Sequence, residues 1–170
     1  MENLNTKIVI TGDSLSWRVK LVYQVSAWVL VLSTTLGTLF AVGLAYQNGI
    51  GVLEVSLFVF MYALSGIGIT VGYHRLFSHR AFDAPLFVQV ILGILGALAC
   101  QGPLIYWVST HRRHHQFSDR PGDPHSPYTD LVNTLPPVKG FLHAHMGWIF
   151  RHDLTNTFRF SKDLFQDPVL

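Results

Sequence analysis

Five of the nine histidines in this chain of 170 residues fall into two tight clusters. The first has the form H-x4-H and consists of His74 and His79, and the second has the form H-x2-H-H, with His111, His114 and His115. In an α-helix, at about 100° per residue, the second cluster presents three imidazoles on one face within about 100° of arc. The two histidines of the first cluster are about 140° apart, so both reach one centre only beside the helix end or where the helix is distorted.

The residue types indicate a metal site with more than one ion. Imidazole binds zinc, copper, iron and nickel, and the single cysteine, Cys100, offers no thiolate cluster for a structural zinc site. One zinc ion takes three or four protein ligands, and five histidines exceed that set. The clusters therefore predict a dinuclear centre. Two simpler readings remain open, namely isolated polar histidines at a membrane boundary and, for Arg112 and Arg113, a basic patch that attracts anionic lipid headgroups.

The rest of the sequence is apolar and predicts an integral membrane protein. Hydrophobic residues make up 49% of the chain and charged residues 13%, whereas a typical soluble domain carries about 25% charged residues. Membrane helices are predicted at about 25–46 and 55–73, each close to the roughly 20 residues that a bilayer requires. The second of these helices contains Gly66, Gly68 and Gly72, which favour close helix packing.

The basic residues predict how the helix pair is oriented. Lys7, Arg18 and Lys20 precede the first helix, and Arg75 and Arg80 follow the second. The loop between the two helices contains no lysine or arginine. Under the positive-inside rule both ends of the pair face the cytoplasm. The small net charge of +2 and the dispersed basic residues do not indicate a nucleic-acid partner.

The stretch 84–110 carries no charge and is long enough for a third crossing. A single crossing would carry Arg112 and Arg113 to the outside and would separate the two histidine clusters. We therefore predict an interfacial or re-entrant segment at about 84–110, followed by a cytoplasmic segment over 111–170. The expected fold is an all-α integral membrane protein, a two-helix transmembrane hairpin with interfacial or amphipathic helices, in one domain over 1–170.

The residues in and around the clusters resemble those of the membrane fatty acid desaturases, most of all the delta-9 group. His74–His79 is similar to the first histidine box of that family and His111–His115 to the second. The flanking residues are also similar over roughly 50–170, and they include Gly68–Tyr73, Ala97–Gly102, Trp107, Asp123–His125, His145–Trp148, Lys162–Leu164 and Asp167–Pro168.

The resemblance implies a non-haem di-iron enzyme that uses O2 and two external electrons to remove two hydrogens from a long acyl chain. It implies iron ligands at His74, His79, His111, His114 and His115. It also implies a fatty acyl substrate, linked to lipid or to CoA, and an electron donor such as ferredoxin or cytochrome b5. Trp107 and Trp148 are candidates for an acyl channel, with interfacial anchoring as the alternative, and no ligand role is expected for His125 or His145.

Two departures from the family pattern affect these expectations. The third histidine box of the family does not occur in the 170 residues. This stretch alone is therefore expected neither to hold two irons nor to catalyse desaturation. Acyl-CoA members usually carry Arg-Asp where this chain has Ser109-Thr110, which favours a lipid-linked substrate. The alternatives are a histidine-box hydroxylase or ketolase and a non-enzymatic membrane protein that binds metal or lipid.

Overall fold

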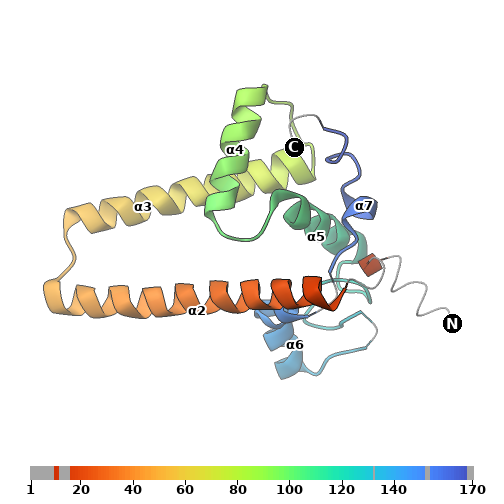
Figure 1. The fold of residues 1–170 in the computed structure, drawn as a ribbon, viewed down its shortest axis with the longest axis horizontal. Helices are drawn as coiled ribbons and strands as arrows, with labels where there is room; N and C mark the ends of the chain where they lie inside the picture. The colour runs from red at the N-terminus through yellow and green to blue at the C-terminus, as the bar shows by residue number, and fades with distance from the viewer. Residues whose placement is uncertain (1–9, 12–15, 132, 152–153, 168–170) are drawn as a thin grey trace.

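The computed structural model describes residues 10–11, 16–131, 133–151 and 154–167, so Lys7 and Pro168 lie outside the described residues. Among the described residues the regular structure is helical, apart from one isolated antiparallel bridge between Thr129 and Thr134. The helical fold class is therefore confirmed. With the labels of Figure 1, the elements in chain order are α2 (Trp17–Asn48), α3 (Val52–Ile67), η1 (Gly68–Ser78), α4 (Leu86–Leu98), α5 (Leu104–Phe117), α6 (Pro137–His145), η2 (Gly147–Phe150) and α7 (Thr157–Phe160).

Helices α2 and α3 run in opposite directions from the short turn that joins them, and this turn lies far from the other elements (Figure 1). Helix α2 and the continuous helix Val52–Ser78 are each long and apolar enough to cross a membrane, and the predicted spans 25–46 and 55–73 lie within them. Only 6% of each apolar window is buried inside the molecule. Apolar side chains of a soluble core would be buried, so these two helices are not core helices.

The second long helix changes its winding before it ends. The residues from Gly68 to Ser78 form a π-helix, in which hydrogen bonds join residues five apart instead of four. The His79 N–H donates to the His74 carbonyl at 3.0 Å, and the Ser78 hydroxyl donates to the Tyr73 carbonyl at 2.7 Å. Residues five apart therefore lie one above the other, and the helix distortion that the first histidine cluster requires is present.

The stretch 84–110 is a helix, a turn and the start of a second helix. Helix α4 has 13 residues, which corresponds to about 20 Å and is shorter than the roughly 30 Å apolar core of a bilayer. Cys100 and Gly102 adopt positive φ values of 55° and 100°, and α5 begins two residues later at Leu104. A single continuous helix over 84–110 is therefore not formed.

Glycine allows α4 to pack closely against η1. A Cβ on Gly68 would lie 2.2 Å from the Leu95 carbonyl carbon, and a Cβ on Gly96 would lie 2.3 Å from the Tyr73 ring. Close packing is thus confirmed for Gly68, whereas Gly66 has nothing within 4 Å of its Cβ position. The adjoining hydrophobic core is small and joins η1, α4, α5 and the C-terminal segment through Tyr73, Leu76, Phe77, Leu92, Val108 and Leu164.

The C-terminal elements hold the helices together at the end that carries the histidines (Figure 1). Element η2 contacts α2, where the rings of Trp28 and Phe150 are 4.6 Å apart. The segment after α7 contacts α5 through a hydrogen bond of 2.6 Å between the hydroxyls of Ser109 and Ser161. Both serines are fully buried, so these residues fix the position of α5.

The glycine contacts predict opposite effects for two matched substitutions. Gly68→Ala should lower the free energy of unfolding by about 1–3 kcal/mol, because the added methyl group overlaps the α4 backbone. Gly66→Ala should be neutral or stabilising by up to about 1 kcal/mol, because alanine favours the helix and meets nothing. Thermal and denaturant unfolding in detergent would measure both, and equal effects of the two variants would contradict the prediction.

Candidate metal centre

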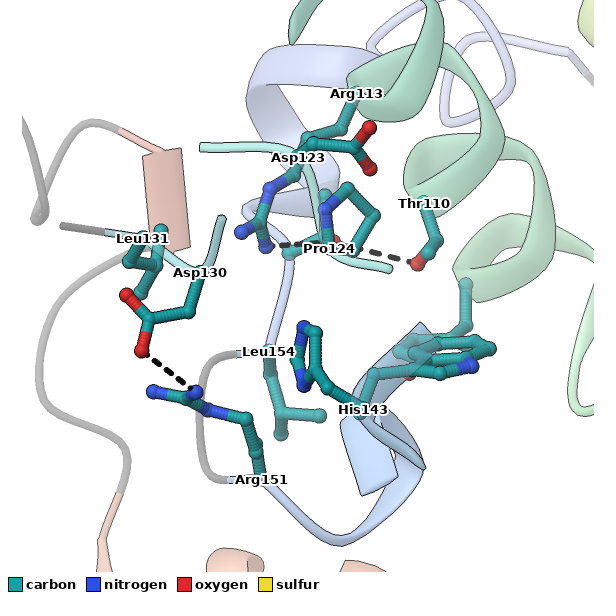
Figure 2. A pocket seen from close by; sticks show the side chains of 12 residues that line it. Thr110, Arg113, Asp123, Pro124, Asp130, Leu131, His143, Arg151 and Leu154 are labelled. Atoms are coloured by element: carbon teal, nitrogen blue, oxygen red, sulfur yellow. Dashed lines mark hydrogen bonds and ion pairs between the residues drawn. The ribbon is translucent and has the colours of Figure 1, made fainter. Parts of the chain in front are cut away.

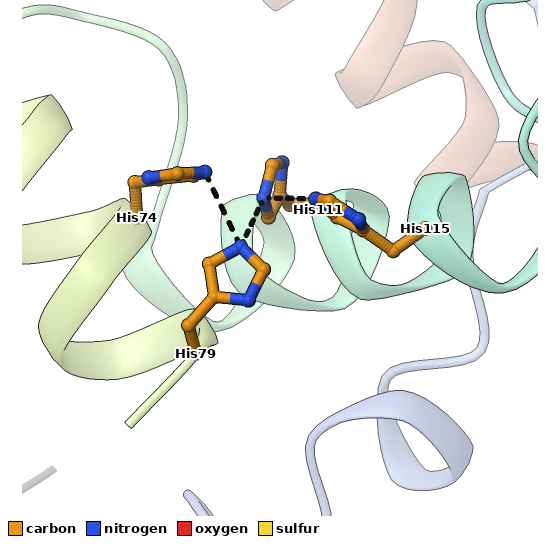
Figure 3. A group of neighbouring side chains, drawn as sticks. All are labelled: His74, His79, His111 and His115. Atoms are coloured by element: carbon orange, nitrogen blue, oxygen red, sulfur yellow. Dashed lines mark hydrogen bonds between the residues drawn. The ribbon is translucent and has the colours of Figure 1, made fainter. Parts of the chain in front are cut away.

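Four imidazoles converge between the end of η1 and helix α5. The Nε2 atom of His79 lies 3.2 Å from that of His74 and 3.1 Å from that of His111. The Nε2 atom of His115 lies 3.0 Å from that of His111. Figure 3 shows the four rings pointing toward one another, two from each histidine cluster. We call His74, His79, His111 and His115 the four-histidine group; its candidate ligand atoms all lie within 4.8 Å of one another.

The separations within the four-histidine group fit a shared metal ion. Two nitrogens that each lie about 2.1 Å from one ion are about 3.0 Å apart at a right angle and about 3.4 Å apart at the tetrahedral angle. A hydrogen-bond network fits less well, because each neutral imidazole nitrogen offers either one N–H or one lone pair. His79 and His111 each direct one Nε2 at two neighbours. The four nitrogens therefore form a group that could hold a metal ion.

Burial and mutual proximity keep the central imidazoles uncharged. Burial, together with the neighbouring histidines, lowers the pKa of His111 to about 3. Burial and the nearby His74, His115 and Arg112 also lower the pKa of His79 below its ordinary value. Metal ions bind the neutral form of imidazole. The two residues at the centre of the group thus have the protonation state that a metal ligand needs.

The fifth predicted ligand, His114, lies apart from this group. Its ring centroid is 6.5 Å from that of His111 and 5.6 Å from that of His115. Instead, His114 forms a second group of possible metal-binding residues with Asp123 and His125, with candidate atoms within 4.8 Å of one another. The structure therefore brings four of the five predicted ligands together and places the fifth beside them.

Arg112 joins the two histidine clusters through all five of its N–H groups. Nε donates to the Ser78 carbonyl at 2.9 Å, and Nη2 donates to the Phe77 carbonyl at 2.9 Å. Nη1 donates to the Phe160 carbonyl at 3.0 Å, and both Nη atoms donate to the Asp163 carboxylate, at 2.6 and 3.0 Å. The carbonyls of Phe77 and Ser78 lie at the end of the π-helix, where helical carbonyls need other donors. Arg112 therefore caps the helix that presents His74 and His79.

Arg113 also points into the molecule. Its side chain is 1% exposed, Nε donates to the Gly122 carbonyl at 2.7 Å, and Nη1 donates to the Thr155 hydroxyl at 3.2 Å. An arginine that binds lipid headgroups would keep its guanidinium in the headgroup region. The reading of Arg112 and Arg113 as a basic lipid-binding patch does not agree with these contacts.

Trp107 lies directly against the four-histidine group. Its ring stacks on His111 with centroids 4.9 Å apart and an interplanar angle of 21°. The indole N–H donates to the Gln101 side-chain oxygen at 2.9 Å, and the ring meets Tyr73 edge-on at 5.7 Å. Trp107 therefore forms an apolar wall beside these imidazoles.

Trp148 has different surroundings. Its ring lies 5.4 Å from that of His125, and it lines a polar pocket with His143, Asp130 and Arg151 (Figure 2). The pocket has a volume of about 20 Å³, which is room for about one water molecule. This cavity is too small to hold an acyl chain, and the role of Trp148 in an acyl channel stays a prediction.

Sequence reasoning missed the residues that support the histidines. Asp123 and Asp163 stood within the flanking motifs, but nothing in those motifs indicated which side chains they contact. Asp123 is fully buried beside His114, and Asp163 contacts Arg112 and Arg80. The contact between such a carboxylate and a histidine cluster can be identified only from the three-dimensional structure.

Proteins of known activity are similar to this chain. A hex-5-enoyl-(acyl-carrier protein) acetylenase of Moorena producens is 43% identical over 138 residues, which cover 80% of this chain and 43% of that protein. An sn-1 stearoyl-lipid 9-desaturase of Anabaena variabilis is 43% identical, with 61% of this chain and 35% of that protein covered. Delta-9 acyl-lipid desaturase 1 of Arabidopsis thaliana is 45% identical, with 58% and 28% covered.

These alignments span less than half of the length of each relative. No family model matches the chain. No solved structure matches it either.

The contacts of Arg112 predict that lysine cannot replace it. Arg112→Lys should lower the free energy of unfolding by about 2–4 kcal/mol, because lysine cannot satisfy five acceptors in the geometry of a guanidinium. Arg75→Lys is a matched control, since Arg75 is exposed beside the same cluster. Denaturant unfolding in detergent would compare the two, and a loss no larger than that of the control would contradict the role of Arg112.

Asp163 should add an acid-sensitive contribution to stability. The hydrogen bond from Arg112 lowers the pKa of Asp163 to about 2, and Arg80 acts in the same direction. Because the folded-state pKa is depressed below the ordinary value of 3.8, the contribution is present above that value and is lost as the pH falls toward about 2. Asp163→Asn should remove this part of the pH dependence. Unfolding curves of both proteins between pH 2 and 6 would test it, and curves that differ by a constant amount would contradict it.

Proposed function

We propose, from the membership of this chain in the membrane fatty acid desaturase family, that it supplies most of a di-iron centre for O2-dependent acyl desaturation. The observation that carries the proposal is the convergence of four Nε2 atoms from two histidine clusters. Such a donor set of neutral imidazoles suits iron. In this reading His74, His79, His111 and His115 bind one ion, and His114 is a ligand of the second.

Iron in this setting would supply the oxidising power that removes hydrogen from an unactivated acyl chain when O2 and two electrons are provided. The chain itself holds the ligands and shields them. Arg112 fixes the end of the π-helix against α5, and Trp107 covers one side of His111 with an apolar ring. An electron donor such as ferredoxin or cytochrome b5 completes the proposed reaction.

The proposed substrate is a long acyl chain, and the proposed position of the new double bond is delta-9. Some relatives that match the chain are named as delta-9 acyl-lipid desaturases. Others are named as an acyl-CoA desaturase or as an acetylenase that acts on an acyl group bound to acyl-carrier protein. The side chains at Ser109 and Thr110 are buried and bond to Ser161 and Thr155. These two positions, where acyl-CoA members usually carry Arg-Asp, therefore offer no charged group to a CoA thioester. This supports a lipid-linked substrate.

Expression in a host without its own desaturase tests the function. The complete gene should give a new monounsaturated fatty acid by mass spectrometry, together with iron in the purified protein. His79→Ala should abolish both, because it removes the imidazole that contacts His74 and His111. His145→Ala is the control, since its ring stacks on Phe141 outside both histidine groups. A hydroxylated product would favour a hydroxylase, and iron without any product would favour a metal-binding protein.

We also propose that α2 and the helix Val52–Ser78 cross the membrane as a hairpin, with the histidines on the cytoplasmic face. The support is the exposure of their apolar side chains and the position of the basic residues near the histidine end. A cysteine at Asn48 in a Cys100→Ser background should react with an impermeant thiol reagent from outside intact cells, and one at Lys162 should react only after lysis. The reverse pattern would contradict the orientation.

A further inference from the structure

We propose that Asp123 is a positioning residue for His114. It keeps the imidazole in the tautomer that carries hydrogen on Nδ1, so that Nε2 presents a lone pair. The inference rests on the proposed function, in which His114 is a metal ligand, but the tautomer itself exists with or without metal. The second group of possible metal-binding residues therefore contains one ligand and its support, and it is not a separate three-residue metal site.

The first argument is the contact between the two side chains. The Asp123 side chain has no exposed surface, and its two oxygens lie 3.0 and 3.1 Å from Nδ1 of His114. A buried carboxylate without its proton only accepts hydrogen bonds, so the ring nitrogen that faces it must carry the hydrogen. In a neutral imidazole the other nitrogen then has the lone pair. Carboxylates hold metal-binding histidines in many sites by this contact.

Asp123 also accepts hydrogen bonds from the backbone on both sides of it. Oδ1 also accepts the backbone N–H of His125 at 3.1 Å, and Oδ2 accepts that of Asp119 at 2.9 Å. Because the single His114 Nδ1–H is shared between the two oxygens, three N–H donors occupy most of the roughly four acceptor positions of the carboxylate. The carboxylate therefore already serves as the hydrogen-bond acceptor for the loop backbone and for His114.

The second argument is the arrangement of the two histidine rings. The rings of His114 and His125 are stacked, with centroids 4.3 Å apart and an interplanar angle of 29°. The lone pairs of imidazole lie in the ring plane, so stacked rings do not direct them to one point. The His125 ring instead lies over the face of His114, and its centroid is also 5.4 Å from that of Trp148.

The backbone around the pair is held in place as well. Arg113, which precedes His114, donates from Nε to the carbonyl of Gly122, which precedes Asp123, at 2.7 Å. Arg113 and Asp123 lie together on one side of the polar pocket in Figure 2. Since the arginine is 1% exposed, this contact is shielded from water and fixes the loop against α5.

The test is a direct measurement of the tautomer. The complete protein, with ¹⁵N-labelled histidine, is purified in detergent and stripped of metal, and His114 is assigned through His114→Gln. Wild-type His114 should be predominantly in the Nδ1–H form. Asp123→Asn should lower the ratio of the Nδ1–H to the Nε2–H form by about tenfold or more, because one acceptor oxygen becomes a donor. Asp119→Asn, the same substitution in the same loop, should leave the ratio unchanged.

Two results would overturn the inference. One is a wild-type His114 that is mainly in the Nε2–H form, which remains decisive even if Asp123→Asn does not fold. The other is a folded Asp123→Asn protein with the wild-type ratio. After iron is restored, Asp123→Asn should hold less iron than Asp119→Asn, and equal iron would also count against the inference. A wild-type protein that binds no iron would refute the proposed function and leave the tautomer result standing.

Discussion

The winding of one helix decides whether the candidate metal centre exists. His74 and His79 are five residues apart, and α-helical winding would point them about 140° away from each other. The π-helix from Gly68 to Ser78 brings residues five apart into line, and the His79 N–H bonds to the His74 carbonyl. Both rings then reach His111 on another helix. π-Helical turns are rare and occur frequently at functional sites, which agrees with the placement of this one.

The end of the π-helix needs hydrogen-bond donors from the surrounding residues. A π-helix ends in carbonyls that have no partner within the helix, and the Arg112 guanidinium supplies donors to two of them. Because the same guanidinium binds Asp163 and the Phe160 carbonyl, it also attaches the C-terminal segment. Within the second histidine cluster, the ligand candidates and the arginines thus have separate tasks. His111 and His115 face the first cluster, and the arginines hold the backbone that carries the histidines.

Spacing and composition predict the long apolar helices, the meeting of the two histidine clusters and the close packing at Gly68. They do not predict the separation of His114 from the other four histidines, because helical periodicity places it on the same face as His111 and His115. His114 instead contacts Asp123, which lies nine residues away in a loop. The partners of Arg112 lie 34 to 51 residues away in the sequence. Contacts of this kind depend on the tertiary structure and cannot be predicted from helical periodicity alone.

The distribution of polar groups supports one direction for the hairpin. Its far end, around Gly49 and Gly51, carries one charged side chain, Glu54, which caps the adjoining helix through the Gly51 N–H. The histidine end contains the ion pairs of Arg80, Arg112 and Arg151. Charged groups are costly inside a bilayer and require either water or ionic partners. An end with many paired charges can lie at the membrane surface in contact with water, while the apolar helices extend away from it.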